Sequence, residues 1–450
     1  MAILQVSSMI HAQEQSYVLS LTQAREYALQ HNKILLNAKD NITSSKEKIK
    51  ETISQGLPQV NSSMDFMTYF NYELNFSFGS TSDGFNIDYT KLDAGDVEVL
   101  NALGQMFGSS EPIIMDNQLS GKVQVSQLIF SGQYWAGIQT AKIARELADQ
   151  SLVKTELDIK ENITNTYYLI LTTEQTLKII AENLDNLTSI LQHTDNLFRM
   201  GIVEQTDVDL LKITVSQLKN TQKSLERNIQ LTYNMMKFQL GVAPDAKIVL
   251  ADNLERMMEN IRMKETLATD FDITNNITYK LMESQVLLNK KQVEMQNWAY
   301  APTVAGFYSY TKKILTTEFD LTPNHLAGVN LSLPVFSSGM RRSKVAQAKI
   351  NLDMTIRNQE IVKDQLETQK KQLLFNYQSA LENFNTQKES IEVASRVLAS
   401  IQNKFREGLV SSLDFTQANS NYLNAESNYL SSVLTLLQAQ TALDKLYNQL

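Results

Sequence analysis

Two aspartates occupy matching positions in two copies of one sequence pattern. Asp207 follows the segment FRMGI at residues 198–202, and Asp414 follows FREGL at residues 405–409, so a shift of 207 residues relates them. A carboxylate behind a glycine turn can cap the next helix, and in an oligomer it can form a ring that attracts cations. Capping is the favoured role for Asp207, whereas capping and gating are both open for Asp414.

No other group of residues suggests chemistry. The four histidines are scattered without metal-ligand spacing, and the sequence contains no HExxH, GxSxG or phosphate-binding glycine loop. The absence of cysteine excludes thiol nucleophiles, disulfides and Cys-based zinc sites. We therefore expect a protein that is not an enzyme and needs no cofactor.

The shift extends well beyond the two aspartates. It relates further pairs of identical residues, and a shift of 244 relates others near the start of each half: Gly132 and Gly339, Asn196 and Asn403 by 207; Asn32 and Asn276, Pro58 and Pro302 by 244. One structural unit is therefore duplicated, and its first copy carries an insertion between Pro58 and Gly132. We assign repeat 1 to residues 16–242, a linker to 243–272 and repeat 2 to 273–450.

Composition limits the class of protein. With 15 Gly and 6 Pro in 450 residues, long stretches run without helix breakers, which indicates long helices. The net charge of −8, with both signs interspersed, argues against a nucleic-acid partner. The sequence contains no run of 18 or more apolar residues, so it predicts no transmembrane helix. Residues 1–15 resemble the remnant of a secretory signal peptide without its basic start.

A long alternation of apolar and polar residues runs over residues 60–78. Ordinary strands have about 5–6 residues, whereas a tilted strand that crosses a bilayer needs about 9–11, with one face toward lipid and the other toward a lumen. Lipid contact is favoured over a buried sandwich core for the apolar face, which comprises Val60, Met64, Phe66, Phe70, Tyr72, Leu74 and Phe76.

Three further segments alternate in the same way, at residues 119–125, 304–310 and 329–335. Each repeat thus contributes one β-hairpin, the first with a long loop at residues 79–118. Four strands cannot close a barrel, and lipid excludes an open sheet edge because its backbone groups would lack hydrogen-bond partners. Several chains must therefore combine.

The segment after each hairpin is helical. Neither Gly nor Pro occurs between Gly137 and Gly201, and apolar residues recur every seven positions in both repeats. They are Ile163, Ile170, Leu177, Leu184, Leu191 and Phe198 in repeat 1, and Tyr377, Phe384, Ile391, Leu398 and Phe405 in repeat 2. This heptad spacing predicts coiled-coil packing, and the narrow stripe suits a cylinder of helices better than a globular bundle.

These features resemble the TolC family of outer-membrane efflux ducts. The resemblance covers residues 21–446 and rests on the duplicated unit, on VNLSLPVF at residues 329–336 followed by Gly339, and on the two Gly–Asp turns. It implies a mainly α fold with β. Four strands from each chain of a homotrimer would form a 12-stranded outer-membrane β-barrel, continued by a long periplasmic α-helical coiled-coil barrel. The implied function is the exit duct of a tripartite efflux pump or type I secretion system, in the bacterial outer membrane and extending into the periplasm.

The resemblance also assigns a docking surface. The two turns would form the periplasmic tip that binds an adaptor (membrane-fusion) protein, which in turn contacts an inner-membrane RND or ABC transporter. The matching residues are Met200, Gly201 and Ile202 in repeat 1, and Glu407, Gly408 and Leu409 in repeat 2.

A periplasmic gate is implied as well. The pore constriction of the family often carries two acidic residues, one turn apart, at the start of the last helix. Asp414 matches the first, but Gln417 stands at the second, so a trimer would have one carboxylate ring and bind divalent metal weakly. Arg199 and Arg406 could hold the gate shut through a carboxylate such as Asp207, although solvated surface charges are the favoured interpretation.

Two other classes of protein remain open. A coiled-coil structural scaffold would explain the heptads but not the four alternating segments. A surface receptor or adhesin would use the loop at residues 79–118, for which a variable surface loop is the simplest interpretation.

Overall fold

The structure is a computed structural model that describes residues 16–70, 72–74, 89–107, 113–115, 117–263, 271–315 and 322–450. The chain divides into two compact units. The first comprises the residues up to Glu47, Lys142–Lys290 and Lys349–Leu450; the second comprises Lys48–Ala141 and Lys291–Ala348. Among the helices in these described ranges, none combines the length and the apolar character needed to cross a membrane.

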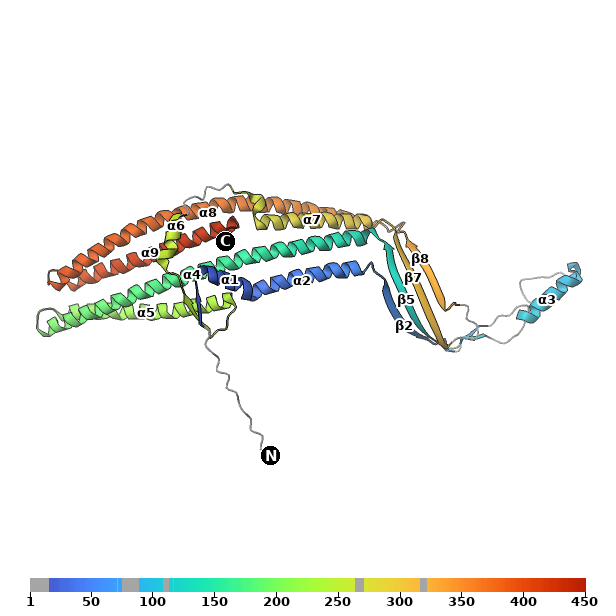
Figure 1. Cartoon of the computed structure of the whole chain (residues 1–450), viewed down its shortest axis with the longest axis horizontal. Helices are drawn as coiled ribbons and strands as arrows, with labels where there is room; N and C mark the ends of the chain where they lie inside the picture. Colours follow the sequence, from blue (N-terminus) through green and yellow to red (C-terminus); the bar gives the residue numbers. More distant parts are fainter. Residues whose placement is uncertain are drawn as a thin grey trace, which may run out of the picture. The chain divides into compact units, whose positions relative to one another are not determined.

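Long helices dominate the described chain (Figure 1). The first half contains α1 (Leu21–His31), α2 (Lys33–Ser54), α4 (Gly132–Arg199) and α5 (Gln205–Leu240). The second half contains α7 (Ile277–Trp298), α8 (Met340–Arg406) and α9 (Ser412–Leu446). With 68 residues in α4 and 67 in α8, the predicted long helices are confirmed.

The heptad residues form an inward-facing seam. Ile163 and Ile170 are fully buried, Phe384 is buried, and the other members of both stripes are half-buried. The seam ends near the turn between α8 and α9. There Phe405 of α8 stacks on the fully buried Phe415 of α9, with ring centroids 5.2 Å apart. Because seven-residue spacing keeps one stripe facing the partner helix, the sequence pattern was sufficient to predict this seam.

The segment expected to be a linker, residues 243–272, contains regular structure. It includes β6 (Lys247–Leu250), which pairs in parallel with β1 (Ser16–Leu19), and α6 (Leu254–Met263). A short 3-10 turn (Ile273–Asn275) precedes α7. The linker prediction missed β6 because a four-residue strand leaves almost no periodicity in the sequence, and it missed α6 although Leu254, Met257, Met258 and Ile261 recur at helical spacing.

The second unit holds a four-stranded antiparallel sheet in the order β2-β5-β7-β8 (Figure 1). Its strands are β2 (Gln59–Met67), β5 (Gln118–Phe130), β7 (Thr303–Leu315) and β8 (His325–Ser332). Each of the four alternating segments therefore supplies a strand. β2 and β8 stand first and last in this strand order, so they are the edge strands and each has one neighbour in the sheet.

The first alternating segment is shorter than predicted. β2 ends at Met67, and Phe70 has a positive φ of 52° that interrupts the extended chain. Tyr72 and Leu74 belong to a separate strand, β3 (Tyr72–Leu74), which pairs with β4 (Ile113–Met115). Phe76 lies outside the described residues. The prediction of one strand over residues 60–78 is wrong because alternation reports residue types, whereas the break depends on a backbone conformation that Phe rarely adopts.

The insertion at residues 79–118 is also more structured than a loop. It contains a 3-10 turn (Tyr89–Lys91), α3 (Ala94–Phe107) and β4, and its last residue is the first of β5.

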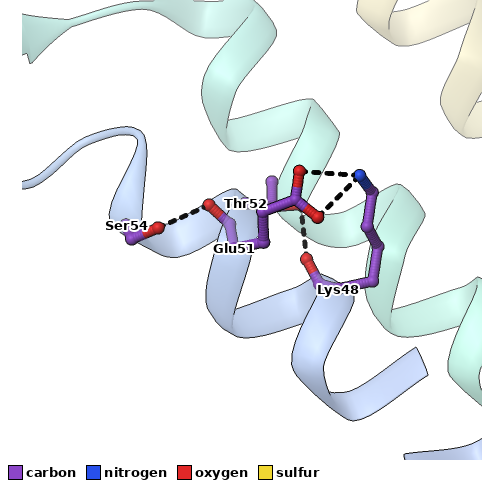
Figure 2. Close-up of polar contacts among 4 residues, drawn as sticks. All are labelled: Lys48, Glu51, Thr52 and Ser54. Atoms are coloured by element: carbon purple, nitrogen blue, oxygen red, sulfur yellow. Dashed lines mark hydrogen bonds and ion pairs between the residues drawn. The ribbon is translucent and has the colours of Figure 1, made fainter. Parts of the chain in front are cut away.

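The last turn of α2 ends on side-chain hydrogen bonds (Figure 2). Thr52 Oγ1 donates to the carbonyl of Lys48 at 2.8 Å, and Ser54 Oγ donates to the carbonyl of Glu51 at 2.8 Å. The carbonyl of Glu51 also accepts from the N–H of Gln55 at 3.3 Å, so the Ser54 hydroxyl adds a second hydrogen bond to it, as serine often does near a helix end. Lys48 Nζ also pairs with Glu51 at 2.8 Å on the exposed surface, where an ion pair contributes little stability.

Candidate functional site

The two helix–helix turns have the same backbone structure. Gly201 and Gly408 both have a φ of 73°. In each turn, two N–H groups donate to carbonyls of the last helical turn: Gly201 to Phe198 (2.8 Å) and Ile202 to Leu197 (3.0 Å), and Gly408 to Phe405 (3.0 Å) and Leu409 to Lys404 (2.9 Å). This is the Schellman motif, which favours glycine because no Cβ opposes the positive φ.

Apolar side chains are exposed at both turns. Met200, Ile202 and Leu409 are each exposed by about two thirds, and Glu407 is exposed as well. Leu413, in the first turn of α9, is equally exposed and was not predicted as a site residue. Large apolar side chains gathered at the ends of helices are a feature of protein-binding surfaces.

Asp207 links the two turns within one chain. Its Oδ2 accepts from the N–H of Glu204, the residue before α5, at 3.3 Å. Its Oδ1 accepts from the hydroxyl of Ser412, the first residue of α9. Because Ser412 is only 3% exposed, water competes weakly for this hydrogen bond. Asp207 thus reaches back to the start of its helix as the partner of Glu204, which is the N-cap, so the prediction of Asp207 as the cap itself is wrong, and the bond to Ser412 was not predicted.

Asp414 forms a capping box with Ser411. Ser411 Oγ accepts from the N–H of Asp414 at 3.1 Å, and Asp414 Oδ2 accepts from the N–H (3.2 Å) and hydroxyl (2.7 Å) of Ser411. These hydrogen bonds hold the pKa of the exposed Asp414 carboxyl below its ordinary value. Ser411 is therefore the N-cap, and Asp414 is its partner three residues later.

Gln417 lies one turn beyond Asp414 on α9. Its Nε2 donates to Oδ1 of Asn421 at 2.9 Å, and both Asp414 and Gln417 are exposed. The helical spacing puts all three residues on one face. Within the described ranges, no cluster of three or more side chains has the types and positions to hold a metal ion.

Neither arginine binds Asp207. Arg199 Nη2 instead pairs with Asp195, one turn earlier in α4, at 2.8 Å. Arg406 is exposed and makes no ion pair within the part of the chain that the structure describes. Within the described residues of one chain, neither arginine is therefore tied to Asp207, and the exposed Arg406 fits the favoured interpretation of a solvated surface charge.

One face of the four-stranded sheet is mainly apolar, although the register also places Ser62, Lys312 and His325 on it. The register places Val60 opposite Val125, and Val125 opposite Tyr308, and residues directly opposite one another share a face. Exposed residues of this face come from every strand: Val60, Met64 and Phe66 from β2, Val123 from β5, Tyr308 and Tyr310 from β7, and Val329 and Leu331 from β8.

The opposite face is mainly polar, with Phe307 and the exposed Leu326 as exceptions. It carries Asn61, Ser63 and Asp65 in β2, Lys122 and Gln124 in β5, and Ser309 and Thr311 in β7. Every residue of β2 is exposed, so the described chain covers neither face of this strand. Such two-sided exposure, apolar on one side and polar on the other, is typical of strands between lipid and a water-filled lumen.

A pair of buried amides connects the long helices, and no sequence signal predicted it. Asn183 of α4 donates to Asn419 of α9 at 2.8 Å, and Asn419 donates back at 3.2 Å. Both are buried. Asparagine is also common on the exposed faces of these helices, so residue type alone does not reveal the pair. For the same reason, the residue type of Ser412 did not identify it as a site residue.

Comparisons with known proteins agree with this geometry. The model of the family "Outer membrane efflux protein" matches residues 105–242 and 280–449, which together are more than half of the chain. The chain belongs to this family. Its place is therefore the outer membrane, with an extension into the periplasm.

The relatives are distant. Outer membrane protein TolC of Salmonella enteritidis is 20% identical over 306 residues, which cover 64% of this chain and 59% of that protein. The aligned region thus spans less than two thirds of the TolC length. Two solved structures share the fold: the outer membrane protein VceC of Vibrio cholerae (TM-score 0.69, 15% identity, 95% of each chain) and the CmeC outer membrane channel of Campylobacter jejuni (TM-score 0.71, 14% identity, 95% of this chain and 85% of that one).

Proposed function

We propose that this outer membrane efflux protein is the passive exit duct of a tripartite efflux pump or a type I secretion system. The observation that carries the proposal is the sheet that is apolar on one exposed face and polar on the other. Such a sheet suits a wall between lipid and an aqueous lumen. An inner-membrane RND or ABC transporter would supply the energy.

A homotrimer would close the wall. β2 and β8 each have one neighbour in the sheet, so their outer backbone groups need partners from another chain before they can enter lipid. Pairing β8 of one copy with β2 of the next would give three copies a closed barrel of 12 strands. The duplicated helices, repeat 1 over residues 16–242 and repeat 2 over 273–450, would continue it as a helical barrel.

Adaptor docking is assigned to the two turns. Their glycines set a fixed backbone, and their apolar side chains are exposed. The assigned residues are Met200, Gly201 and Ile202 in the first turn, and Glu407, Gly408 and Leu409 in the second.

The periplasmic gate would be kept closed by the hydrogen bond from the Ser412 hydroxyl to Asp207, because separating α9 from α5 must break this hydrogen bond. Replacing Ser412 with Ala removes the donor without changing charge and should raise single-channel conductance in planar bilayers. The matched control is Ser420→Ala, which deletes an exposed hydroxyl of the same helix. Equal conductance of the two variants would remove Ser412 from the gate.

Extraction of cell envelopes in detergent, followed by sizing, tests the proposed function. We expect a trimer that is released only from outer-membrane fractions. A monomer or dimer in the soluble fraction would overturn the duct and favour the coiled-coil scaffold, for which the unpaired edges of β2 and β8 would then need another explanation.

A further inference from the structure

Two basic side chains stand on the mainly apolar face of the four-stranded sheet. The register places Lys312 of β7 opposite Gly121 of β5. It places His325 of β8 opposite Tyr310 of β7. Lys312 and His325 are both exposed. A charged side chain on a lipid-facing strand is costly at the middle of the bilayer and costs little near its interfaces, so the height of Lys312 in the membrane decides what it can do.

The length of β7 gives that height. The strand begins at Thr303, shortly after the exposed aromatic side chains of Trp298 and Tyr300. Aromatic residues gather where the apolar band of a membrane barrel meets water. Lys312 lies nine residues beyond Thr303, which is roughly 23 Å along the membrane normal at about 3.4 Å per residue and a tilt of about 40°. An apolar band of about 25 Å therefore ends close to Lys312.

The connections of the sheet decide which leaflet this is. Phe130, the last residue of β5, pairs with Val304 near the start of β7, and α4 and α7 adjoin these two strand ends. In the proposed duct the helices extend into the periplasm, so this end of the sheet is the inner one. Lys312 and His325, at the opposite end, then lie at the level of the outer leaflet, where the headgroups of outer-membrane lipids carry phosphates.

Two tyrosines of β7 hold the ring of His325. The Tyr308 hydroxyl lies 2.8 Å from Nδ1 of His325, and the rings of Tyr310 and His325 have centroids 4.9 Å apart. We assign the hydroxyl as the donor of this hydrogen bond, which leaves the ring hydrogen of a neutral imidazole on Nε2. Nε2 can then donate to an anion on the exposed face of the sheet.

Lys312 makes no hydrogen bond or ion pair with any of the residues that the structure describes. Among the strand residues that the register places on its face, none is acidic. At Gly121, its neighbour in β5, an added Cβ would meet no described atom within 4 Å, so the surface beside the lysine is open. Lys312 follows Tyr310 by two residues and is thus the diagonal neighbour of His325, a spacing that a long side chain can bridge. An ammonium group and an imidazole donor therefore border the same open area.

We propose that Lys312 and His325 form a binding site for the phosphate group of an outer-leaflet lipid, with Tyr308 positioning the histidine ring. The inference rests on the proposed duct and adds a lipid site to its outer wall. The ammonium group of Lys312 pairs with the phosphate, and Nε2 of His325 donates to one of its oxygens. The acyl chains of the same lipid lie along the apolar face, over Gly121 and Val123. Free phosphate uses only the polar half of this site, so the phosphorylated lipid binds more tightly.

Binding of lipid A to the detergent-purified trimer tests the site. Native mass spectrometry compares the affinity for diphosphoryl lipid A with that for the same lipid after removal of its phosphates, which the unsubstituted protein should bind at least tenfold more weakly. Lys312→Gln/His325→Gln should weaken binding of diphosphoryl lipid A at least tenfold, whereas Lys312→Arg keeps the charge and should retain binding. The matched control Lys122→Gln removes a lysine next to Gly121 from the polar face of the same strand and should leave binding unchanged.

Three results would overturn the lipid site. They are equal binding by Lys312→Gln/His325→Gln and the Lys122→Gln control, equal binding of the two lipids by the unsubstituted protein, and displacement of the lipid by an equal concentration of inorganic phosphate, which would make free phosphate the ligand. The comparison of the two lipids needs no variant, so it tests the site even if a substitution impairs folding.

The test also separates the lipid site from the proposed function. A trimer from outer-membrane fractions that binds both lipids equally leaves the duct intact and removes only the lipid site. If no trimer forms in the outer membrane, both proposals fail.

Discussion

An arginine in the centre of β5 should prevent assembly of the trimer when it is on the apolar face of the sheet, and it should be tolerated on the polar face. Val123 and Gln124 are neighbours near the middle of this 13-residue strand, and they point to opposite faces. Val123 is exposed and lies between Ser62 and Tyr310 on the apolar face. Gln124 lies on the polar face, two residues from Lys122.

The magnitude follows from the position. Arginine on the lipid face costs about 2–4 kcal/mol at the middle of a bilayer, so three copies would lose roughly 6–12 kcal/mol per trimer. Gln124→Arg adds the same side chain to a face that already carries a lysine, so it should cost little.

The assay compares the two variants by the amount of trimer in outer-membrane fractions and by its resistance to heating in detergent. Val123→Arg should abolish assembled trimer, whereas Gln124→Arg should retain it. Equal amounts of equally stable trimer from both variants would refute the lipid-facing assignment of this face.

Three further predictions concern the helices. Gly408→Ala should lower the free energy of unfolding by about 1–2 kcal/mol through its positive φ alone, because none of the described residues lies within 4 Å of the added Cβ. Gly241→Ala should lower the Tm by more than Gly408→Ala does, because its Cβ would stand 2.4 Å from the carbonyl oxygen of His31; equal Tm values for the two variants would contradict this. Met200→Asp should weaken capture of the adaptor in pull-down assays while the trimer persists, since it charges an exposed apolar turn; undiminished capture would exclude this residue from docking. Burial raises the pKa of Glu426, so the folded state binds its proton more tightly and loses stability as pH rises through the raised value. Glu426→Gln should therefore raise the Tm at neutral pH but not at acidic pH, and a Tm gain independent of pH would contradict the linkage.

Local patterns account for what could be predicted. The seven-residue spacing from Ile163 to Phe198 predicted an inward seam, because a helix repeats its faces at nearly this interval. Gly201 and Gly408 predicted the turns, since a positive φ is easiest for glycine. The alternation at residues 119–125 predicted a strand, because successive side chains point to opposite faces.

Tertiary structure decided the rest. By itself, the sequence determined the seam, the turns and the two-faced strands, because each depends on neighbours a few positions away. It did not determine where β2 ends, since the positive φ of Phe70 has no signature in residue type. Nor did it reveal the bond between Ser412 and Asp207 or the pair of Asn183 and Asn419, whose partners are more than 200 residues apart. Those contacts depend on how far one helix slides along another, and that register is set only when the whole seam packs.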